Sequence, residues 1–168
     1  MMTENTHMDA LNILLVDDDR ILVTTLSHGL RKAMGKAVSV TFCASGPEAL
    51  ALLATQAFNL VISDFHMPGM SGLELLKKVR HDHPEMSLAL ITAYATDTLT
   101  EEAGQLGIGY ITKPFELPLL AQLIQDLTRS KEPGEGIEKH PHIPIIDDNV
   151  DPVPLTTKVV IDQEDSNR

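Results

Sequence analysis

The sequence has little cysteine, little positive charge and no long hydrophobic run. The single cysteine, Cys43, cannot form a disulfide within the chain, so we expect a small core residue in a reducing, cytoplasmic protein. No stretch approaches the roughly 18 consecutive apolar residues that cross a bilayer, and we expect no membrane span. The first residues, MMTENTHMDA, lack a basic stretch followed by an apolar core, so we expect no signal peptide there.

The charge balance argues against direct binding of nucleic acid. The chain has 13 basic and 24 acidic residues, for a formal charge of −11. Direct binding needs a basic patch that replaces the counterions of the phosphates, and no predicted helix carries a dense stripe of lysine and arginine. We therefore expect any effect on transcription to pass through another protein.

What the sequence does contain is a regular alternation, over residues 11–129, of short apolar runs and longer amphipathic stretches. The apolar runs, at residues 12–16, 38–42, 60–63, 88–92 and 109–112, are nearly continuous, as in strands covered on both faces. Two sets recur at helical spacing: Leu22, Leu26, Gly29, Leu30 and Ala33, and Leu119, Leu120, Leu123, Ile124 and Leu127. The pattern predicts an α/β fold of five βα units, with a doubly wound parallel sheet.

Capping signals mark the ends of the predicted helices. Pro47 and Pro118 are placed where a first helical turn accepts proline, and Gly35, Gly104 and Gly107 suit helix exits. The capping pairs are Ser45 with Glu48, Ser71 with Glu74 and, more weakly, Thr98 with Glu101.

The composition changes after about Arg129. Residues 130–168 hold five of the ten prolines and nine of the 24 acidic residues, without a helical period. The runs IPII and KVVI could pair as strands, although the prolines would restrict them to sheet edges. We interpret residues 10–129 as one domain and residues 130–168 as an acidic, proline-rich tail or truncated linker, with no recognisable output domain.

Charged or hydroxyl side chains follow four of the five predicted strands. They are Asp17, Asp18 and Asp19 after the first strand, Asp64 after the third, Thr92 after the fourth, and Lys113, which precedes Pro114, after the fifth. The carboxyl ends of parallel strands meet at one edge, so these groups should converge. Clustered carboxylates favour a hard cation such as Mg²⁺, and an aspartate can attack phosphorus to form an acyl phosphate. The metal, a lysine and a hydroxyl could together neutralise the transferred phosphoryl group.

Each residue also has an ordinary structural interpretation. Asp19 suits the N-cap of the first helix, Thr92 could simply end a strand, and Lys113 could be a solvated surface lysine. Several histidines invite a metal-binding or phosphoaccepting role, but none has a paired ligand at metal spacing, so we interpret them as solvated loop residues. These histidines are His66, His81, His83, His140 and His142. It is the conjunction at the strand ends that favours the phosphoryl chemistry.

Four segments resemble the receiver domain of bacterial two-component response regulators. They are ILLVDDDR, LVISDFHMPGMSGLELL, LALITAYA and GYITKPF, which occur in the order and at the spacing of that family across residues 11–129. The resemblance implies a flavodoxin-like (CheY-like) fold with strand order 2-1-3-4-5. It also implies a cytoplasmic signalling module and phosphoprotein of a phosphorelay, which catalyses only its own phosphorylation and dephosphorylation and is otherwise not an enzyme.

The resemblance assigns a role to each strand-end residue. Asp64 resembles the phosphoacceptor, and Thr92 and Lys113 resemble the groups that bind the phosphoryl. Asp18 resembles the direct Mg²⁺ ligand and Asp17 its water-mediated companion, with Asp64 completing the carboxylates. The main-chain carbonyl of His66 would be the third protein ligand.

Further positions of the family concern switching. Thr92 and Tyr110 match the hydroxyl and the aromatic residue that reorient on phosphorylation, and Pro114 would follow a cis peptide bond. His66 and Tyr94 match positions that flank the path of the attacking water.

The resemblance also implies the partners. The phosphoryl group would come from a histidine kinase or a histidine phosphotransfer protein. The output would leave through the fourth helix, fifth strand and fifth helix (residues 95–126), toward a downstream protein or a second copy. The stretch TDTLTEEAGQLG has few large apolar residues, chiefly Leu99 and Leu106, so the fourth helix should move at low cost.

Two alternatives stay open from the sequence. The chain could be the receiver portion of a longer regulator or hybrid kinase. It could also be a phosphatase of the haloacid dehalogenase type, in which Asp17 would be the nucleophile of a D-x-D-x-T/V motif. In this chain Ile21 replaces the Thr or Val, no cap domain is visible, and the Lys-Pro and Met-Pro-Gly sequences favour the receiver.

Overall fold

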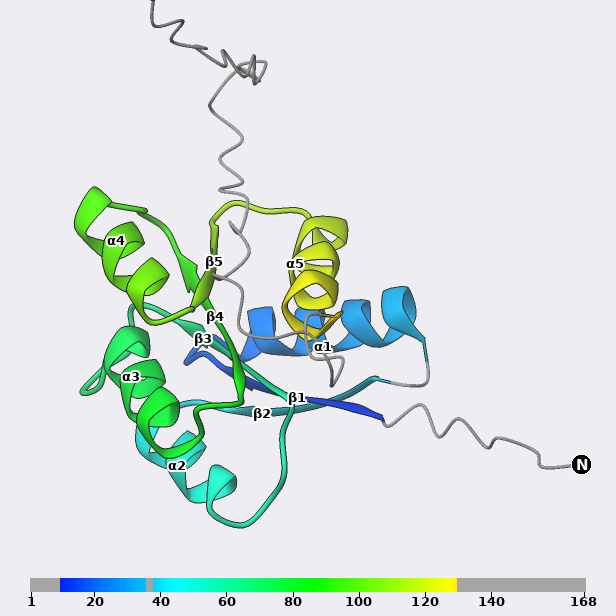
Figure 1. Cartoon of the computed structure of the whole chain (residues 1–168). Coiled ribbons are helices and arrows are strands. Elements are labelled where there is room, and N and C mark those ends of the chain that lie inside the picture. The colour runs from blue at the N-terminus through cyan, green and yellow to red at the C-terminus, as the bar shows by residue number, and fades with distance from the viewer. Residues whose placement is uncertain (1–9, 36–37, 130–168) are drawn as a thin grey trace, which may run out of the picture.

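Strands and helices alternate in the computed structural model, which describes residues 10–35 and 38–129 (Figure 1). The described strands are β1 (Leu11–Val16), β2 (Val38–Cys43), β3 (Leu60–Asp64), β4 (Ser87–Thr92) and β5 (Gly109–Thr112). The helices are α1 (Arg20–Met34), α2 (Gly46–Leu53), α3 (Gly72–Asp82), α4 (Asp97–Gln105) and α5 (Leu117–Arg129). The predicted tail, residues 130–168, lies outside the described residues.

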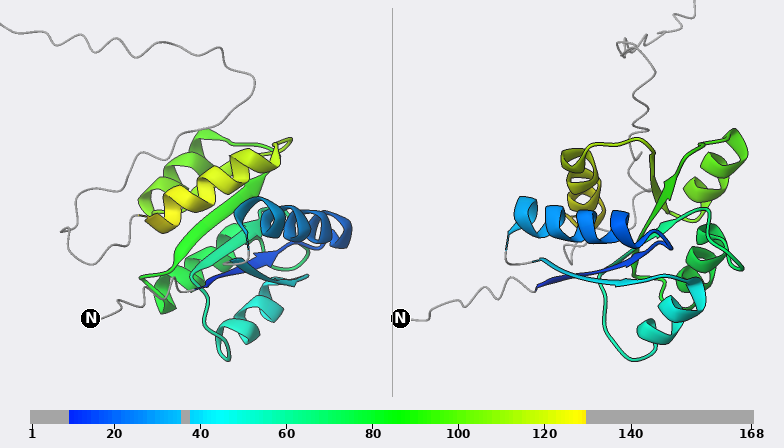
Figure 2. Two further views of the ribbon diagram at one scale, coloured as in Figure 1. Left: turned by 90° about the vertical axis from the view of Figure 1, so that its right-hand side faces the viewer. Right: turned by 180° about the vertical axis from the view of Figure 1, so that it is seen from behind.

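All strand pairings are parallel, and the order is β2-β1-β3-β4-β5, which confirms the predicted topology. Helices α1 and α5 cover one face, whereas α2, α3 and α4 cover the other (Figures 1 and 2). Side chains of a strand alternate between faces, so β1 supplies both cores. Leu14 and Val16 pack toward α2, α3 and α4, and Ile13 and Leu15 pack toward α1 and α5.

Burial explains why some strands were easier to recognise than others. Every residue of β3 and β4 is buried, as the continuous apolar runs predicted. β2 is an edge strand in which buried and more exposed residues alternate, and its Phe42 is 54% exposed. Four strands are one residue longer than predicted, because the added residue joins the ladder. Leu11 pairs with Val38, Cys43 with Val16, Asp64 with Ile91 and Ser87 with Leu60.

Two of the predicted helix starts are confirmed. Ser45 caps α2 and accepts a hydrogen bond from the Glu48 amide (3.4 Å), with Pro47 in the first turn. Ser71 and Glu74 form a complete capping box at α3. Gly35 ends α1 with φ of +83°, a left-handed conformation that suits glycine.

Two local predictions were wrong. The N-cap of α4 is Thr96, whose hydroxyl accepts from the Leu99 amide (3.3 Å), so Thr98 lies inside the first turn. Gly104 lies within α4, which ends at Gln105 with Leu106 as its C-cap, and the glycine that follows the helix with a positive φ is Gly107. The helical pattern predicted over α1 is confirmed: Leu26 and Leu30 are buried, together with Val23, whereas Ala33 is exposed.

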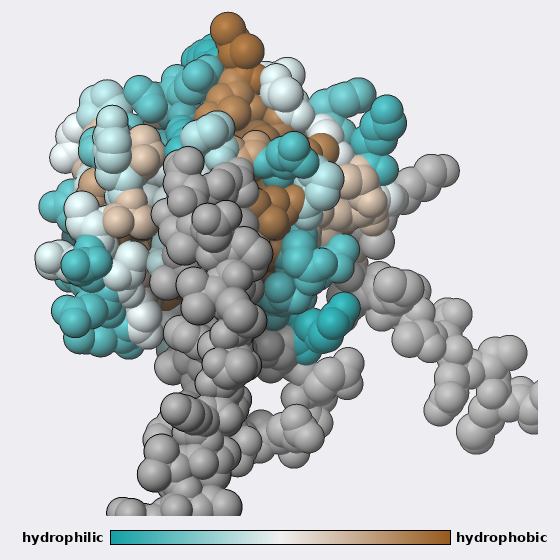
Figure 3. All heavy atoms as spheres, turned by 90° about the horizontal axis from the view of Figure 1, so that it is seen from above, coloured by the Kyte–Doolittle hydropathy of each residue, from teal (hydrophilic) through white to brown (hydrophobic). Residues whose placement is uncertain are grey.

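The surface seen from above is a mosaic in which hydrophobic residues gather in a band between hydrophilic ones (Figure 3). The large hydrophobic side chains most exposed in the described part of the chain are Ile21, Phe42 and Tyr94. Cys43 is buried, and burial raises the pKa of its thiol to about 11, as expected for an inert core residue. None of the described helices has the length and apolar character that crossing a membrane requires.

Candidate phosphoryl and metal site

Three carboxylates meet at the carboxyl edge of the sheet. Asp17 follows β1, and its amide donates to the carbonyl of Cys43 on β2 (3.2 Å). Asp64 is the last residue of β3, and its side chain lies beside those of Asp17 and Asp18, with one oxygen of each within 4.8 Å of the others. Asp17 and Asp64 are buried, whereas Asp18 is exposed. The structure thus brings together the acids that the sequence placed at two different strand ends.

Lys113 provides the positive charge of the site. Its Nζ lies 2.6 Å from Asp64 Oδ1 and 3.6 Å from Asp17 Oδ2, the second distance being an ion pair too long for a hydrogen bond. The Lys113 amide donates to the Thr92 carbonyl (2.7 Å), and the following bond to Pro114 is cis. The hydrogen bond from the Lys113 amide holds the backbone from which the ammonium reaches the carboxylates.

The surroundings raise the pKa of both kinds of group, which disfavours the charged form of the aspartate and favours the charged form of the lysine. Burial raises the pKa of Asp17, and the charges of Asp64 and Asp18 add to that rise. Burial opposes the charge of Lys113, but the hydrogen bond to Asp64 and the charges of both aspartates raise its pKa overall. The site holds excess negative charge that one lysine does not balance.

The main chain around Asp64 is tightly packed. Asp64 Oδ2 accepts from the His66 amide (2.8 Å), and the turn that follows contains Gly69 with φ of +82°. Gly72, at the start of α3, lies so close that a Cβ on it would be 2.0 Å from the Asp64 carbonyl oxygen. Gly72 was not predicted from the sequence, although a glycine that opens a helix despite its low propensity is a usable signal of close approach.

Thr92 and Tyr110 lie on neighbouring strands but have different surroundings. Thr92 is fully buried, and its hydroxyl donates to the Tyr94 carbonyl (3.0 Å) and accepts from the Tyr94 amide (3.2 Å). Tyr110 is 9% exposed and packs in the same core as Leu99 and Ala103 of α4. Within the part of the chain that the structure describes, its hydroxyl has no hydrogen-bond partner, and burial raises its pKa. The ring already occupies the interior position.

Asp19 has the structural role that its position suggested. Its carboxylate accepts from the amides of Ile21 (2.9 Å) and Leu22 (3.1 Å) and so caps α1. The histidines His66 and His81 are exposed and His83 is half-buried, and across residues 10–35 and 38–129 the group of possible metal ligands contains no histidine. His140 and His142 lie outside the described residues.

The donor set fits Mg²⁺. Asp17 Oδ2 is buried and, among the described residues, has no hydrogen-bond partner, which leaves it available to a ligand. Three carboxylates with oxygen donors only, one of them solvent-exposed, suit a hard cation that keeps some of its waters. Such an ion would offset the excess negative charge of the cluster.

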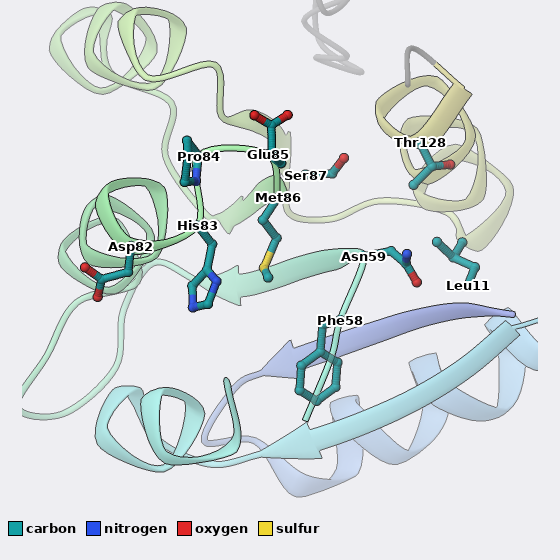
Figure 4. A pocket seen from close by; sticks show the side chains of 10 residues that line it. All are labelled: Leu11, Phe58, Asn59, Asp82, His83, Pro84, Glu85, Met86, Ser87 and Thr128. Atoms are coloured by element: carbon teal, nitrogen blue, oxygen red, sulfur yellow. The ribbon is translucent and has the colours of Figure 1, made fainter. Parts of the chain in front are cut away.

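A hollow of about 730 Å³ lies at the opposite edge of the sheet (Figure 4). It is lined by the loop between α3 and β4, by the start of β1 and by Thr128 of α5. Asn59 on its wall already forms two hydrogen bonds with Asn12: its Oδ1 accepts from the Asn12 amide (2.7 Å), and its amide donates to the Asn12 carbonyl (2.8 Å). The Ser87 hydroxyl donates to the Leu127 carbonyl (2.8 Å). None of the three clustered aspartates lines this hollow, so we place the functional site at the carboxyl edge.

A family model described as the response regulator receiver domain matches residues 13–125. The response regulator protein FleR of Pseudomonas aeruginosa is 40% identical over 126 residues, which cover 74% of this chain and 26% of FleR. The response regulator MprA of a Mycobacterium species is 32% identical over 147 residues, which cover 85% of this chain and 61% of MprA. The chain therefore spans less than two thirds of the length of these relatives.

Solved structures show the same likeness. The chemotaxis response regulator CheY4 of Vibrio cholerae is 30% identical, with a TM-score of 0.62 over 70% of this chain and 98% of CheY4. A CheY-like receiver domain protein of Methanospirillum hungatei is 29% identical, with a TM-score of 0.65 over 74% of this chain and 98% of that one. Between the two chemistries that the sequence left open, these matches favour the receiver over the phosphatase. The chain belongs to the response regulator receiver domains, the CheY-like signalling modules of two-component systems.

Proposed function

We propose that this chain is a phosphorylation-controlled switch that accepts a phosphoryl group on Asp64. The observation that carries the proposal is a buried carboxylate at a strand tip, 2.6 Å from the Lys113 ammonium and beside two further aspartates. Residues 10–129 would form the receiver domain. The donor would be a histidine kinase or a histidine phosphotransfer protein.

The chemistry is a displacement at phosphorus. A carboxylate oxygen of Asp64 attacks the phosphorus of the donor, the bond from phosphorus to the donor atom breaks, and an acyl phosphate forms on Asp64. Lys113, which now pairs with Asp64, would pair with a phosphoryl oxygen, and the Thr92 hydroxyl would donate to another. The groups that would hold Mg²⁺ are Asp17, Asp18, Asp64 and the main-chain carbonyl of His66. The ion would supply positive charge that offsets the charge of the phosphoryl oxygens. His66 and Tyr94 are both exposed, so both side chains could meet the water that later attacks the acyl phosphate.

The switch would begin at Thr92. Its hydroxyl is engaged with the main chain of Tyr94, so drawing it toward a phosphoryl group would break both contacts and free the segment that leads into α4. Tyr110 packs in the same core as Leu99 of that helix, and its hydroxyl has no hydrogen-bond partner among the described residues, which costs about 1–3 kcal/mol and favours exchange for another arrangement. Phosphorylation would thus bias a two-state surface on α4, β5 and α5 (residues 95–126).

The output would be read by a downstream protein or by a second copy of the chain. The absence of direct nucleic-acid contact and the cytoplasmic location remain predictions from charge and cysteine content. The relatives include DNA-binding transcriptional regulators named NtrC, of which this chain spans 23% of the length.

The test is labelling by acetyl phosphate with Mg²⁺, measured as the intact mass of the protein. We expect one added phosphoryl group on the parent chain and none on Asp64→Asn. Asp82→Asn is the matched control, because this exposed aspartate lies at the opposite edge of the sheet, and it should be labelled like the parent. Equal labelling of Asp64→Asn and the parent would show that the nucleophile is elsewhere.

A further inference from the structure

We infer that Arg80 of α3 fixes the carboxyl end of α4, so that this helix responds to phosphorylation by moving at its amino end. The anchor itself can be tested in the unphosphorylated protein, and only the direction of movement rests on the function proposed above. Arg80 would be a positioning residue, because it contacts neither the aspartates nor the phosphoryl group.

The guanidinium of Arg80 joins two backbone segments. Nε donates to the Leu106 carbonyl (2.9 Å) and Nη2 to the Gly107 carbonyl (3.1 Å), at the end of α4. Nη1 donates to the carbonyls of Pro84 (2.6 Å) and Met86 (2.9 Å), in the loop between α3 and β4. The fixed fork of a guanidinium suits such multiple contacts, and hydrogen bonds from a charged donor are stronger than neutral ones.

Helix α4 needs this cation from outside. The carboxyl end of a helix carries partial negative charge, so a cation there is stabilising. The last turn of α4 contains no basic residue of its own. Arg80, which lies on α3, supplies the positive charge that the last turn of α4 lacks.

The other carbonyls that Arg80 contacts belong to a segment tied to the sheet. The loop that bears Pro84 and Met86 forms a wall of the hollow in Figure 4. The Met86 amide donates to the His83 carbonyl (3.0 Å), and the next amide, of Ser87, donates to the Asn59 carbonyl (3.2 Å). Arg80 therefore links the end of α4 to a supported segment. Lys77 of α3 and Glu102 of α4 form a second link, although both side chains are solvent-exposed and add little.

The amino end of α4 is held much less firmly. Every residue of 93–98 is exposed, and Leu99 is the first buried side chain after Thr92. The approach to the helix depends on the contacts between Thr92 and Tyr94 and on the Thr96 cap, which are neutral hydrogen bonds of 3.0–3.3 Å. If a phosphoryl group captures the Thr92 hydroxyl, this end is released while the Arg80 end stays in place.

Amide hydrogen exchange of the free protein, followed residue by residue, tests the anchor. The amides of Leu106, Gly107 and Ile108 are protected by bonds to Glu102, Gly104 and Ala103, and they report on the carboxyl end. Arg80→Met should speed their exchange about tenfold or more relative to the Thr100 amide, because it removes hydrogen bonds from a charged donor. Arg31→Met is the control: Arg31 also donates to a backbone carbonyl, that of Val40 (2.9 Å), but on α1, and its loss should leave these amides unchanged.

The same measurement with Mg²⁺ and beryllofluoride, a mimic of the phosphoryl group, tests the direction of movement. In the parent chain the change should be concentrated at Leu99 and Thr100, and in Arg80→Met it should spread to residues 106–108. Arg80→Lys keeps the charge but cannot reach all four carbonyls, so it should restore part of the protection. A purely structural role would change the overall stability, measured by urea unfolding, without relocating the response to beryllofluoride.

Two results would overturn the inference. One is unchanged exchange at residues 106–108 in free Arg80→Met, and the other is a parent response as large at residues 106–108 as at Leu99 and Thr100. If beryllofluoride alters no amide of the parent, the proposed function fails, whereas the result in the free protein still decides whether Arg80 anchors α4.

Discussion

The two edges of the sheet differ in what they leave unsatisfied. The amino edge has a hollow of about 730 Å³, yet Asn59 and Ser87 on its wall already have hydrogen-bond partners within the chain. At the carboxyl edge Asp17 and Asp64 are buried side by side, and Asp17 Oδ2 has no hydrogen-bond partner among the described residues. Burying carboxylates together is costly unless a ligand compensates. Uncompensated charge, more than empty volume, therefore marks the functional edge.

Among the substitutions that test this difference between the two edges, Gly72→Ala should have the largest effect. A Cβ at this position would lie 2.0 Å from the Asp64 carbonyl oxygen, and neither backbone segment can yield. We expect a loss of about 3 kcal/mol or more in the free energy of unfolding, together with impaired labelling of Asp64. Urea unfolding and intact-mass measurement check the two effects.

Gly104→Ala is the control for Gly72→Ala. Gly104 lies within α4, and a Cβ there would meet no atom within 4 Å. This variant should gain up to about 1 kcal/mol from the better helix propensity of alanine. Equal stability of the two variants would contradict the account of close packing against Asp64.

The next largest effects are expected at Asp18 and Asp19, two adjacent acids that follow β1. Asp18→Ala should lower the affinity for Mg²⁺ at least about tenfold, because it removes an exposed oxygen donor of the cluster. Asp19→Ala should keep that affinity and instead lose about 1 kcal/mol of stability, because Asp19 caps α1. Titration of each variant with Mg²⁺ separates the roles, and unchanged affinity in Asp18→Ala would contradict the metal site.

A smaller effect, an increase in the free energy of unfolding, is expected from Asp17→Asn. In the absence of metal the substitution removes one charge from a crowded cluster, so it should raise the free energy of unfolding at neutral pH by about 1 kcal/mol. The asparagine carbonyl can still accept the hydrogen bond from the Asp19 amide (2.8 Å). Mg²⁺ should then stabilise the parent more than the variant. A variant less stable than the metal-free parent would show that charge repulsion does not dominate this edge.

The smallest effect is expected at the amino edge, from Ser87→Ala. It removes the hydrogen bond to the Leu127 carbonyl and should cost about 1 kcal/mol or less. Labelling by acetyl phosphate should remain as in the parent. Altered labelling in this variant would mean that the two edges are coupled more tightly than the structure indicates.

The sequence predicted the fold well because the buried parallel strands and the helical faces leave strong periodic signals. The continuous apolar runs located β3 and β4, and the paired acids with Lys113 located the site. Errors came where a choice depended on neighbours in space. Thr96 and Thr98 are both acceptable caps locally, and the start of α4 is decided by which hydroxyl reaches the Leu99 amide.

Other features could not be read from local patterns at all. The four contacts of Arg80 join residues up to 27 positions apart, and an arginine on an amphipathic helix gives no sign of them. Tyr110 could be assigned to the switch by resemblance, but its interior position depends on the packing of α4. Gly72 was the one missed residue that carried a usable local signal.

The most direct test of the central claim is to trap the phosphorylated residue chemically. The chain is treated with acetyl phosphate and Mg²⁺ and then reduced with borohydride, which converts an aspartyl phosphate to homoserine, and the modified position is identified by peptide mass spectrometry. The account predicts homoserine at position 64 and at no other aspartate. Homoserine at position 17 or 18, or a phosphoryl group on a histidine that resists reduction, would contradict it.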